Sequence, residues 1–391
     1  MLSSRDTVEH AVVSNHLDGL TGIRGIAALW VLLLHGAMLH VMAPAVGDGR
    51  GALWLFASKG WLGVDMFFVL SGFIISFVYQ RKLMRPSFGE LRHFWLMRLA
   101  RIYPLHLATM VAMAAMVLGA RIVGVELGHA SFYTPGKAAA SLFLVHGWMP
   151  GLKGFNYVSW SVSSEWFAYL LFPLLVFPVV RLRARWANLL VIASILLAMA
   201  ALHGGTKAAI ENQLHPLLRV GGEFVAGCLL FNVFRISQRR RLYDVLAPLT
   251  LVAMAILCAL PRPAVSDFVV VALAGLLIFS LALAPRGGGR LFSGRSAVYL
   301  GKTSYSLYLV HGVVFPLLNG LTRRLFPKPS LALGLVLFVV LVAMTLLVSH
   351  YAWKYVEELG RQRLRTWAER RRELAAQRRR ERQRGPRERY S

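Results

Sequence analysis

The chain has 391 residues, of which 57% are hydrophobic and 16% are charged, and its mean hydropathy is +0.55. Soluble domains carry about a quarter charged residues, so the composition excludes an ordinary soluble protein and predicts a polytopic membrane protein. A net charge of +26 would indicate a nucleic-acid partner in a soluble protein. We expect no nucleic-acid partner here, because Lys and Arg concentrate in loops on one side of the predicted lipid bilayer.

Apolar segments of span length recur along the whole chain. They cover 22–41, 58–79, 100–120, 163–180, 187–203, 215–234, 243–260, 267–284, 298–319 and 330–353. An eleventh apolar segment, 138–149, is too short to cross, because about 20 residues are needed. The predicted fold class is therefore all-α: a polytopic transmembrane bundle of about ten helices plus one short re-entrant or half-span segment.

The distribution of positive charge predicts the topology. With ten spans, the four inner loops carry sixteen Lys and Arg, and the five outer stretches, most of them longer, carry nine. Cytoplasmic loops carry the excess of basic residues, so we predict that both termini are cytoplasmic. The predicted division is a cytoplasmic N-terminal segment (1–16), a transmembrane domain (17–356) and a basic cytoplasmic tail (357–391) that is attracted to anionic lipid.

The first span carries two ionisable residues, Arg24 and His35, within LDGLTGIRGIAALWVLLLH. They are eleven positions apart, about three helical turns, so both lie on one face about 16 Å apart. Ionisable side chains inside a span usually face the protein interior or a water-filled cavity, which predicts a polar path along this helix. In the alternative interpretation, Arg24 snorkels to the interface and His35 is a hydrogen-bonded buried histidine.

Four further candidates lie in the next spans. Asp65, near the outer end of the second span, needs a partner there, and a functional role and a structural one are equally open. Arg98 and Arg101 share a helix face at the cytoplasmic boundary, where they either anchor the span or bind phosphates, which suit the guanidinium fork. Glu165 lies just inside the outer boundary beside the interfacial Trp160, as a proton acceptor, an orienting group or a structural hydrogen-bond partner.

The tenth span contains a polar stripe. Ser304, Tyr308 and His311 are three or four positions apart and therefore share one helix face, and Lys302 lies near the cytoplasmic end. A stripe of hydroxyl and aromatic side chains is more often helix-packing contact than a site. If it is functional, it lines the path of a substrate.

The predicted topology separates positive charge from acid–base groups. This separation suits a polyanionic donor that enters from the cytoplasm and a reaction nearer the far side, with a histidine as general base. It also fits a proton-coupled transporter or flippase of a glycan or lipid-linked substrate, in which buried charges relay protons. Arg24, Arg98, Arg101 and Lys302 lie toward the cytoplasm, and His35, Asp65, Glu165 and His311 lie in the outer half.

Five motifs in order resemble acyltransferase family 3, the membrane-bound O-acyltransferases of bacterial surface glycans. They are the Arg-x10-His of the first span, GVDMFFVLSGF (63–73), the R-x-x-R before IYP, WSVSSEWFAYLLFPLL (160–175) and TSYSLYLVH (303–311). One departure is WSVSSEW, where the family more often has WSLxxEW, although Glu165 is retained. Many members carry a fused extracytoplasmic esterase-like domain, and we expect none in this chain, in which a basic tail follows instead.

The resemblance implies an enzyme of the bacterial inner membrane that takes an acyl group, usually acetyl, from cytoplasmic acyl-coenzyme A. It delivers this group to a sugar hydroxyl of a cell-surface or exported glycan, and no metal is expected. His35 is then the catalytic histidine, which either deprotonates the hydroxyl or is itself acylated, while Glu165 and Asp65 orient or assist. The residues expected to bind the donor are Arg24, Arg98, Arg101 and Lys302. The residues expected along the substrate path are Trp160, Ser304, Tyr308 and His311.

Overall fold

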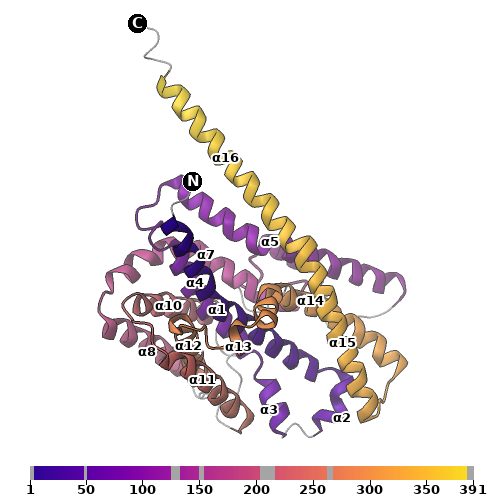
Figure 1. Cartoon of the computed structure of the whole chain (residues 1–391). Coiled ribbons are helices and arrows are strands. Elements are labelled where there is room, and N and C mark those ends of the chain that lie inside the picture. The colour runs from indigo at the N-terminus through magenta and orange to yellow at the C-terminus, as the bar shows by residue number, and fades with distance from the viewer. Residues whose placement is uncertain are drawn as a thin grey trace.

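The computed structural model of the chain describes residues 4–47, 51–124, 133–148, 154–202, 216–261 and 267–384, and all regular secondary structure within these ranges is helical (Figure 1). In this described part, ten long helices correspond to the ten predicted spans. They are α1 (Ser4–Ala37), α4 (Leu62–Tyr79), α5 (Phe88–Ile122), α7 (Trp160–Arg181), α8 (Arg185–Leu202), α10 (Pro216–Arg235), α11 (Leu242–Ala259), α12 (Asp267–Leu283), α14 (Arg295–Leu325) and α15 (Leu331–Ala352). The prediction of an all-α polytopic bundle is confirmed.

Among the described residues, eight helices are long and apolar enough to cross a membrane. Two of the ten predicted spans, α12 and α14, do not meet this requirement for length and hydropathy, each for a different reason. α12 is apolar but has only 17 residues, whereas α14 carries hydroxyl, histidine and basic side chains. Most polar residues in the middle of α14 are buried, and polar side chains inside a span are expected to face the protein interior.

The short apolar segment predicted not to cross is a small helix followed by turns. α6 (Pro135–Leu142) has eight residues, and the chain continues in turns to residue 148, while residue 149 lies outside the described ranges. Eight residues span only about 12 Å as a helix, far less than a bilayer core. The other short elements are η1 (His40–Met42), α2 (Ala43–Val46), α3 (Ala52–Ser58), η3 (Tyr157–Ser159) and α13 (Arg290–Ser293).

Small residues bring α1 very close to α13 and α14. A Cβ atom on Gly22 would lie 1.8 Å from the carbonyl oxygen of Phe292, and one on Gly301 would lie 1.8 Å from that of Thr21. Glycine at such positions is typical of helix interfaces in membranes, because it lets two backbones approach. This packing fixes the helix that carries both ionisable residues of the first span.

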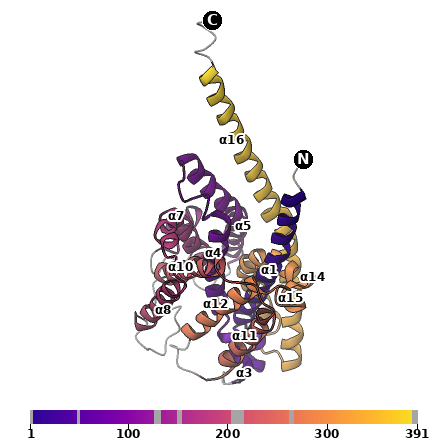
Figure 2. The same cartoon turned by 60° about the vertical axis from the view of Figure 1, so that its left-hand side comes forward.

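The C-terminal helix begins inside the bundle and then leaves it. α15 continues through the π-helical segment η5 (Trp353–Glu358) into α16 (Leu359–Arg384), which projects from the end of the bundle at which α1 begins (Figure 1, Figure 2). The start of α16 lies against α5, since a Cβ atom on Gly360 would be 2.6 Å from Cβ of Pro104. The first turns of the predicted basic tail are therefore packed against a span.

Candidate functional site

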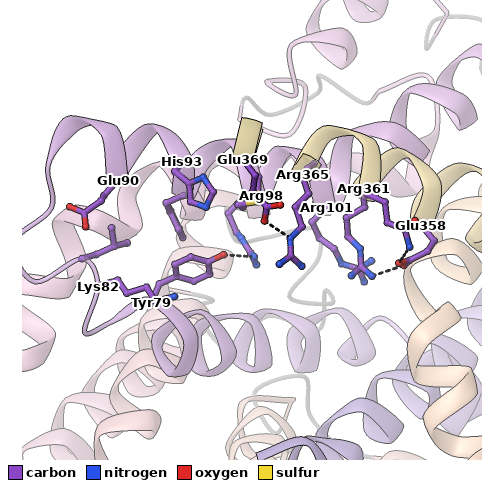
Figure 3. Close-up of a pocket in the computed structure, with 15 residues that line it drawn as sticks. Tyr79, Lys82, Glu90, His93, Arg98, Arg101, Glu358, Arg361, Arg365 and Glu369 are labelled. Carbon is purple, nitrogen blue, oxygen red and sulfur yellow. Dashed lines mark hydrogen bonds and ion pairs between the residues drawn. The ribbon is translucent and has the colours of Figure 1, made fainter. Parts of the chain in front are cut away.

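A cavity of about 730 Å³ lies between α5, α16 and the segment that follows α4 (Figure 3). We call it the α5/α16 cavity. The lining residues run from Glu90 to Arg101 on α5, and from Glu358 at the end of η5 to Glu369 on α16. Most are three or four positions apart, so each helix contributes a single face. Its charged lining residues are Lys82, Arg98, Arg101, Arg361 and Arg365, with Glu90, Glu358 and Glu369.

Arg98 is a cation of this cavity with unused hydrogen-bonding capacity. It donates a hydrogen bond to the Tyr79 hydroxyl (3.0 Å), and its guanidinium carbon lies 4.9 Å from the centroid of the same ring. Its Nε is buried without a hydrogen-bond partner. A buried, unpaired guanidinium N–H is unfavourable, and an anionic ligand in the cavity would satisfy it with a charge-assisted hydrogen bond.

Arg101 is held by a buried carboxylate. It forms an ion pair with Glu357 of η5, whose side chain is 1% exposed. The second oxygen of Glu357 accepts a hydrogen bond from Ser306 Oγ (2.6 Å), so this residue connects α5 to α14 at the start of α16. The connection fixes Arg101 and the start of the helix that faces it.

A second pocket, of about 140 Å³, lies deeper between the helices, and we call it the inner pocket. Arg98 and Arg101 line it as well as the α5/α16 cavity. Arg24 of α1 and Ser304 and Tyr308 of α14 line it too. With Glu165 of α7, six predicted site residues from four helices line this pocket, and Arg98 and Arg101 form the border between it and the α5/α16 cavity.

Glu165 also lines the inner pocket, where two hydroxyl groups hold its carboxylate. Oε1 accepts hydrogen bonds from Ser71 Oγ (2.8 Å) and from the Tyr169 hydroxyl (2.5 Å). Two hydrogen bonds to one carboxylate oxygen fix the orientation of the group. Neither bond uses Oε2, so the carboxylate keeps an acceptor for a further group.

His35 and His311 lie side by side, with ring centroids 5.0 Å apart. Nδ1 of His35 is 3.0 Å from the Val31 carbonyl oxygen, and Nδ1 of His311 is 3.1 Å from that of Leu307. A carbonyl oxygen only accepts hydrogen bonds, so Nδ1 is the protonated nitrogen in both rings, and Nε2 is the basic one when the ring is neutral. Nε2 of His311 is buried without a hydrogen-bond partner. The pair therefore places the buried Nε2 of His311 beside the partly buried ring of His35.

Tyr308 connects the inner pocket to the histidine pair. It lines the pocket, and its ring centroid is 5.7 Å from that of His311. Its hydroxyl donates a hydrogen bond to the Val158 carbonyl oxygen (2.8 Å), which fixes the ring. Tyr157 packs against His35 with a centroid distance of 5.3 Å. The arginines, the carboxylate and the imidazoles thus follow one another from the cavity into the bundle.

Three predicted site residues lie elsewhere. Asp65 is buried, and its Oδ1 accepts a hydrogen bond from Nε of Arg219 at 2.6 Å, which is the partner that its place in a span requires. The Trp160 ring packs against the same guanidinium, 5.6 Å from its carbon atom. Lys302 is exposed and lines neither the α5/α16 cavity nor the inner pocket. Asp65 and Trp160 therefore belong to a buried ion-pair cluster beside the pocket.

Tyr169, Tyr305 and Glu357 belong to the site but to none of the predicted groups. Tyr169 follows Glu165 by four positions, a spacing that indicates a shared helix face and could have identified it. Tyr305 donates a hydrogen bond from its hydroxyl to a carbonyl oxygen of α5, and its ring lies 5.3 Å from the guanidinium carbon of Arg101. Glu357 follows the last apolar segment, where the sequence carries no signal of burial.

Residues 17–353 match the family whose sequence profile is described as the acyltransferase domain of acyltransferase 3 proteins. The chain belongs to acyltransferase family 3. It is 31% identical over 319 residues to the acyltransferase MdmB of Streptomyces mycarofaciens, an alignment that covers 76% of the chain and 79% of MdmB. It is 24% identical over 380 residues to the O-acetyltransferase OatA of Staphylococcus aureus strain NCTC 8325 / PS 47, covering 88% of the chain and 57% of OatA. No solved structure matches the chain.

The family resemblance carried by the five motifs is thereby confirmed. With it, the conclusion that this protein is an enzyme that transfers acyl groups is also confirmed. The chain spans little more than half the length of OatA. The apolar helices of the acyltransferase bundle indicate a membrane protein.

Proposed function

We propose that this acyltransferase moves an acetyl group from acetyl-coenzyme A to a sugar hydroxyl of a cell-surface or exported glycan, with His35 as catalytic histidine. One observation carries the proposal: Arg98 and Arg101 line both the cationic α5/α16 cavity and the inner pocket that approaches the histidine pair. The acetyl group is the one named for the relative OatA, an O-acetyltransferase.

The donor is proposed from the shape and charge of the two spaces. Coenzyme A is a polyanion at its nucleotide end and a thin, uncharged thioester arm at the other. The α5/α16 cavity, with about 730 Å³, lies in the size range of about 300–1,000 Å³ typical of ligand pockets, and five cations line it. The inner pocket of about 140 Å³ suits the thioester arm. The positive-inside pattern supports a cytoplasmic opening of the cavity in a bacterial inner membrane.

The acceptor is proposed to meet the thioester at the histidine pair. In direct transfer, Nε2 of His35 takes the proton of the sugar hydroxyl while the hydroxyl oxygen attacks the thioester carbonyl carbon. The carbon–sulfur bond then breaks, and the coenzyme A thiolate leaves with the proton that the imidazolium returns. In the two-step route, Nε2 attacks the thioester carbonyl carbon first and expels the coenzyme A thiolate. The acyl-imidazole then passes its acyl group to the sugar hydroxyl, and the proton of that hydroxyl ends on the thiolate. Both routes use the same nitrogen.

Membrane vesicles from cells that express the chain test this proposal. We expect label on the glycan fraction when the vesicles receive acetyl-coenzyme A radiolabelled in its acetyl group. His35→Ala should lower this labelling about 10²- to 10⁴-fold, the usual contribution of general acid–base catalysis. The matched control is His40→Ala, since the His40 ring bonds to Asn319 (2.9 Å) outside the histidine pair, and it should keep full labelling.

The outcomes separate the mechanisms and the rival function. Label retained on the protein in the absence of acceptor supports the acyl-histidine route. Unchanged glycan labelling in His35→Ala removes His35 from the reaction. Movement of unlabelled glycan across the vesicle membrane without any acetyl transfer contradicts the proposal and supports a carrier.

A further inference from the structure

α16 forms a wall of the α5/α16 cavity, although it lies beyond residues 17–353 that match the family. Its lining residues and the one before it share one helix face. They are Glu358, the last residue of η5, and Arg361, Gln362, Arg365 and Glu369 of α16. The wall is anchored at its start by the contact of Gly360 with Pro104 and by the Glu357–Arg101 ion pair. It is therefore a fixed part of the cavity.

Arg361 and Arg365 are one helical turn apart on this lining face. Figure 3 shows their guanidinium groups in the same cavity as those of the α5 arginines. Each has a carboxylate partner nearby in the sequence: Arg361 pairs with Glu358 at the end of η5 at 2.5 Å, and Arg365 with Glu369 of α16 at 2.8 Å. All four side chains are at least about a quarter exposed, and exposed ion pairs of this kind are weak. A phosphate group can therefore replace the carboxylates.

We propose that Arg361 and Arg365 of α16 complete the donor site by binding the phosphate groups of coenzyme A, with Arg365 and Lys82 holding the 3′-phosphate. This inference rests on the proposed function for the identity of the donor. It extends the site from the spans to the C-terminal basic helix.

The position of the 3′-phosphate follows from the shape of the donor. The thioester and the 3′-phosphate are at opposite ends of coenzyme A. If the thioester enters the inner pocket, the 3′-phosphate must bind at the part of the α5/α16 cavity away from that pocket. Arg98 and Arg101 line both spaces, whereas Arg361, Arg365 and Lys82 line only the larger one. Of the two α16 arginines, Arg361 is one helical turn closer to Glu357, the ion-pair partner of Arg101, and therefore lies nearer the inner pocket. Arg365 and Lys82 are thus the cations placed for the distal phosphate, and Arg98, Arg101 and Arg361 remain for the pyrophosphate.

The test measures donor binding by the full-length protein in nanodiscs of phosphatidylcholine, by calorimetric titration with acetyl-coenzyme A and with its 3′-dephospho form. We expect the unmodified protein to prefer acetyl-coenzyme A by about tenfold or more, because a hydrogen bond to a charged group is worth about 1.5–3 kcal/mol. Arg365→Ala should weaken acetyl-coenzyme A binding by about the same factor and leave the 3′-dephospho form nearly unaffected. The preference between the two ligands should therefore disappear.

Two further variants of α16 show whether the effect on donor binding is specific to the side chain of Arg365. Arg363→Ala removes the same charge from the same helix, but Arg363 is exposed and does not line the cavity, so both affinities should stay unchanged. Glu369→Gln removes the carboxylate that competes for Arg365, so acetyl-coenzyme A should bind more tightly. A variant that merely damages folding would not tighten binding. In turnover assays, Arg365→Ala should raise KM for acetyl-coenzyme A and leave kcat unchanged.

An anionic lipid headgroup carries the same phosphate chemistry, and a second set of nanodiscs with phosphatidylglycerol distinguishes the two sources. If Arg365→Ala acts only in phosphatidylglycerol and leaves the ligand preference unchanged, the site binds lipid and the inference is wrong. Equal effects of Arg363→Ala and Arg365→Ala also overturn it. Failure of the unmodified protein to bind acetyl-coenzyme A would instead overturn the proposed donor itself.

Discussion

Replacing Arg101 with Met removes the cation of the Arg101–Glu357 ion pair and keeps a side chain of similar length. Glu357, 1% exposed, would be left with Ser306 Oγ as its remaining hydrogen-bond donor. Removing one partner of a buried ion pair costs about 3–5 kcal/mol of unfolding free energy. Because Arg101 itself is 19% exposed and water of the cavity reaches the pair, we expect a loss near the lower end, about 3 kcal/mol.

A double-mutant cycle isolates the pair. Glu357→Gln leaves Arg101 facing the cavity, where water partly solvates it, so its cost should be smaller, about 1.5–3 kcal/mol for a lost hydrogen bond between charged groups. In the double variant both side chains of the pair are uncharged, so no buried charge is left without a partner. Its cost should therefore be smaller than the sum of the single costs, with a coupling energy of about 1–3 kcal/mol.

The assay is unfolding of the purified protein in mixed micelles with increasing dodecyl sulfate, followed by far-ultraviolet circular dichroism. Arg365→Met is the matched control, because its partner Glu369 is exposed and such pairs contribute about 0–1 kcal/mol. Strictly additive single costs, or a loss below about 1 kcal/mol for Arg101→Met, would refute the assignment of this ion pair as the contact that fastens α16 to the bundle.

Three further predictions concern the surroundings of the site. Gly360→Val places a branched side chain where a Cβ atom already meets α5 at 2.6 Å, so α16 should be displaced and KM for acetyl-coenzyme A should rise several-fold in initial-rate measurements with kcat nearly unchanged. Tyr169→Phe removes a hydrogen bond to the Glu165 carboxylate, so single-turnover acyl transfer should slow by about tenfold, and an unchanged rate would separate Glu165 from the reaction. Asp65→Ala leaves Arg219 buried beside one more distant carboxylate, so the unfolding free energy should fall by about 3 kcal/mol while the acetyl-coenzyme A affinity of the folded fraction stays the same.

The spans could be predicted closely because a lipid bilayer imposes the same length on each of them. The apolar segment predicted at 215–234 became α10 (Pro216–Arg235), and the one predicted at 243–260 became α11 (Leu242–Ala259). The segment 138–149 was distinguished from the spans by its short length alone, and the helix found there, α6, has only eight residues. These features depend on the composition of each segment, which can be read from the sequence without knowledge of the fold.

The site was predictable where charge had to face inward. Arg24 and Glu165 were selected as ionisable side chains inside a span, which avoid lipid. Arg98 and Arg101 were selected because they share a helix face at the cytoplasmic boundary. The structure brings all four to the inner pocket. The same rule could not say which charges pair with one another. Asp65 met the same criterion as Glu165, yet it lies in an ion pair with Arg219, 154 positions away in the sequence.

The sequence by itself therefore determined the helices, their apolar lengths and the charged faces that must turn away from lipid. Only the tertiary structure decided that Glu357, 256 positions from Arg101, is its partner and that the basic C-terminal helix forms a wall of the cavity. The physical reason is that burial and ion pairing depend on how each helix is rotated and which neighbour it packs against. Those quantities are set by contacts between segments that are distant in the chain, and no local pattern records them.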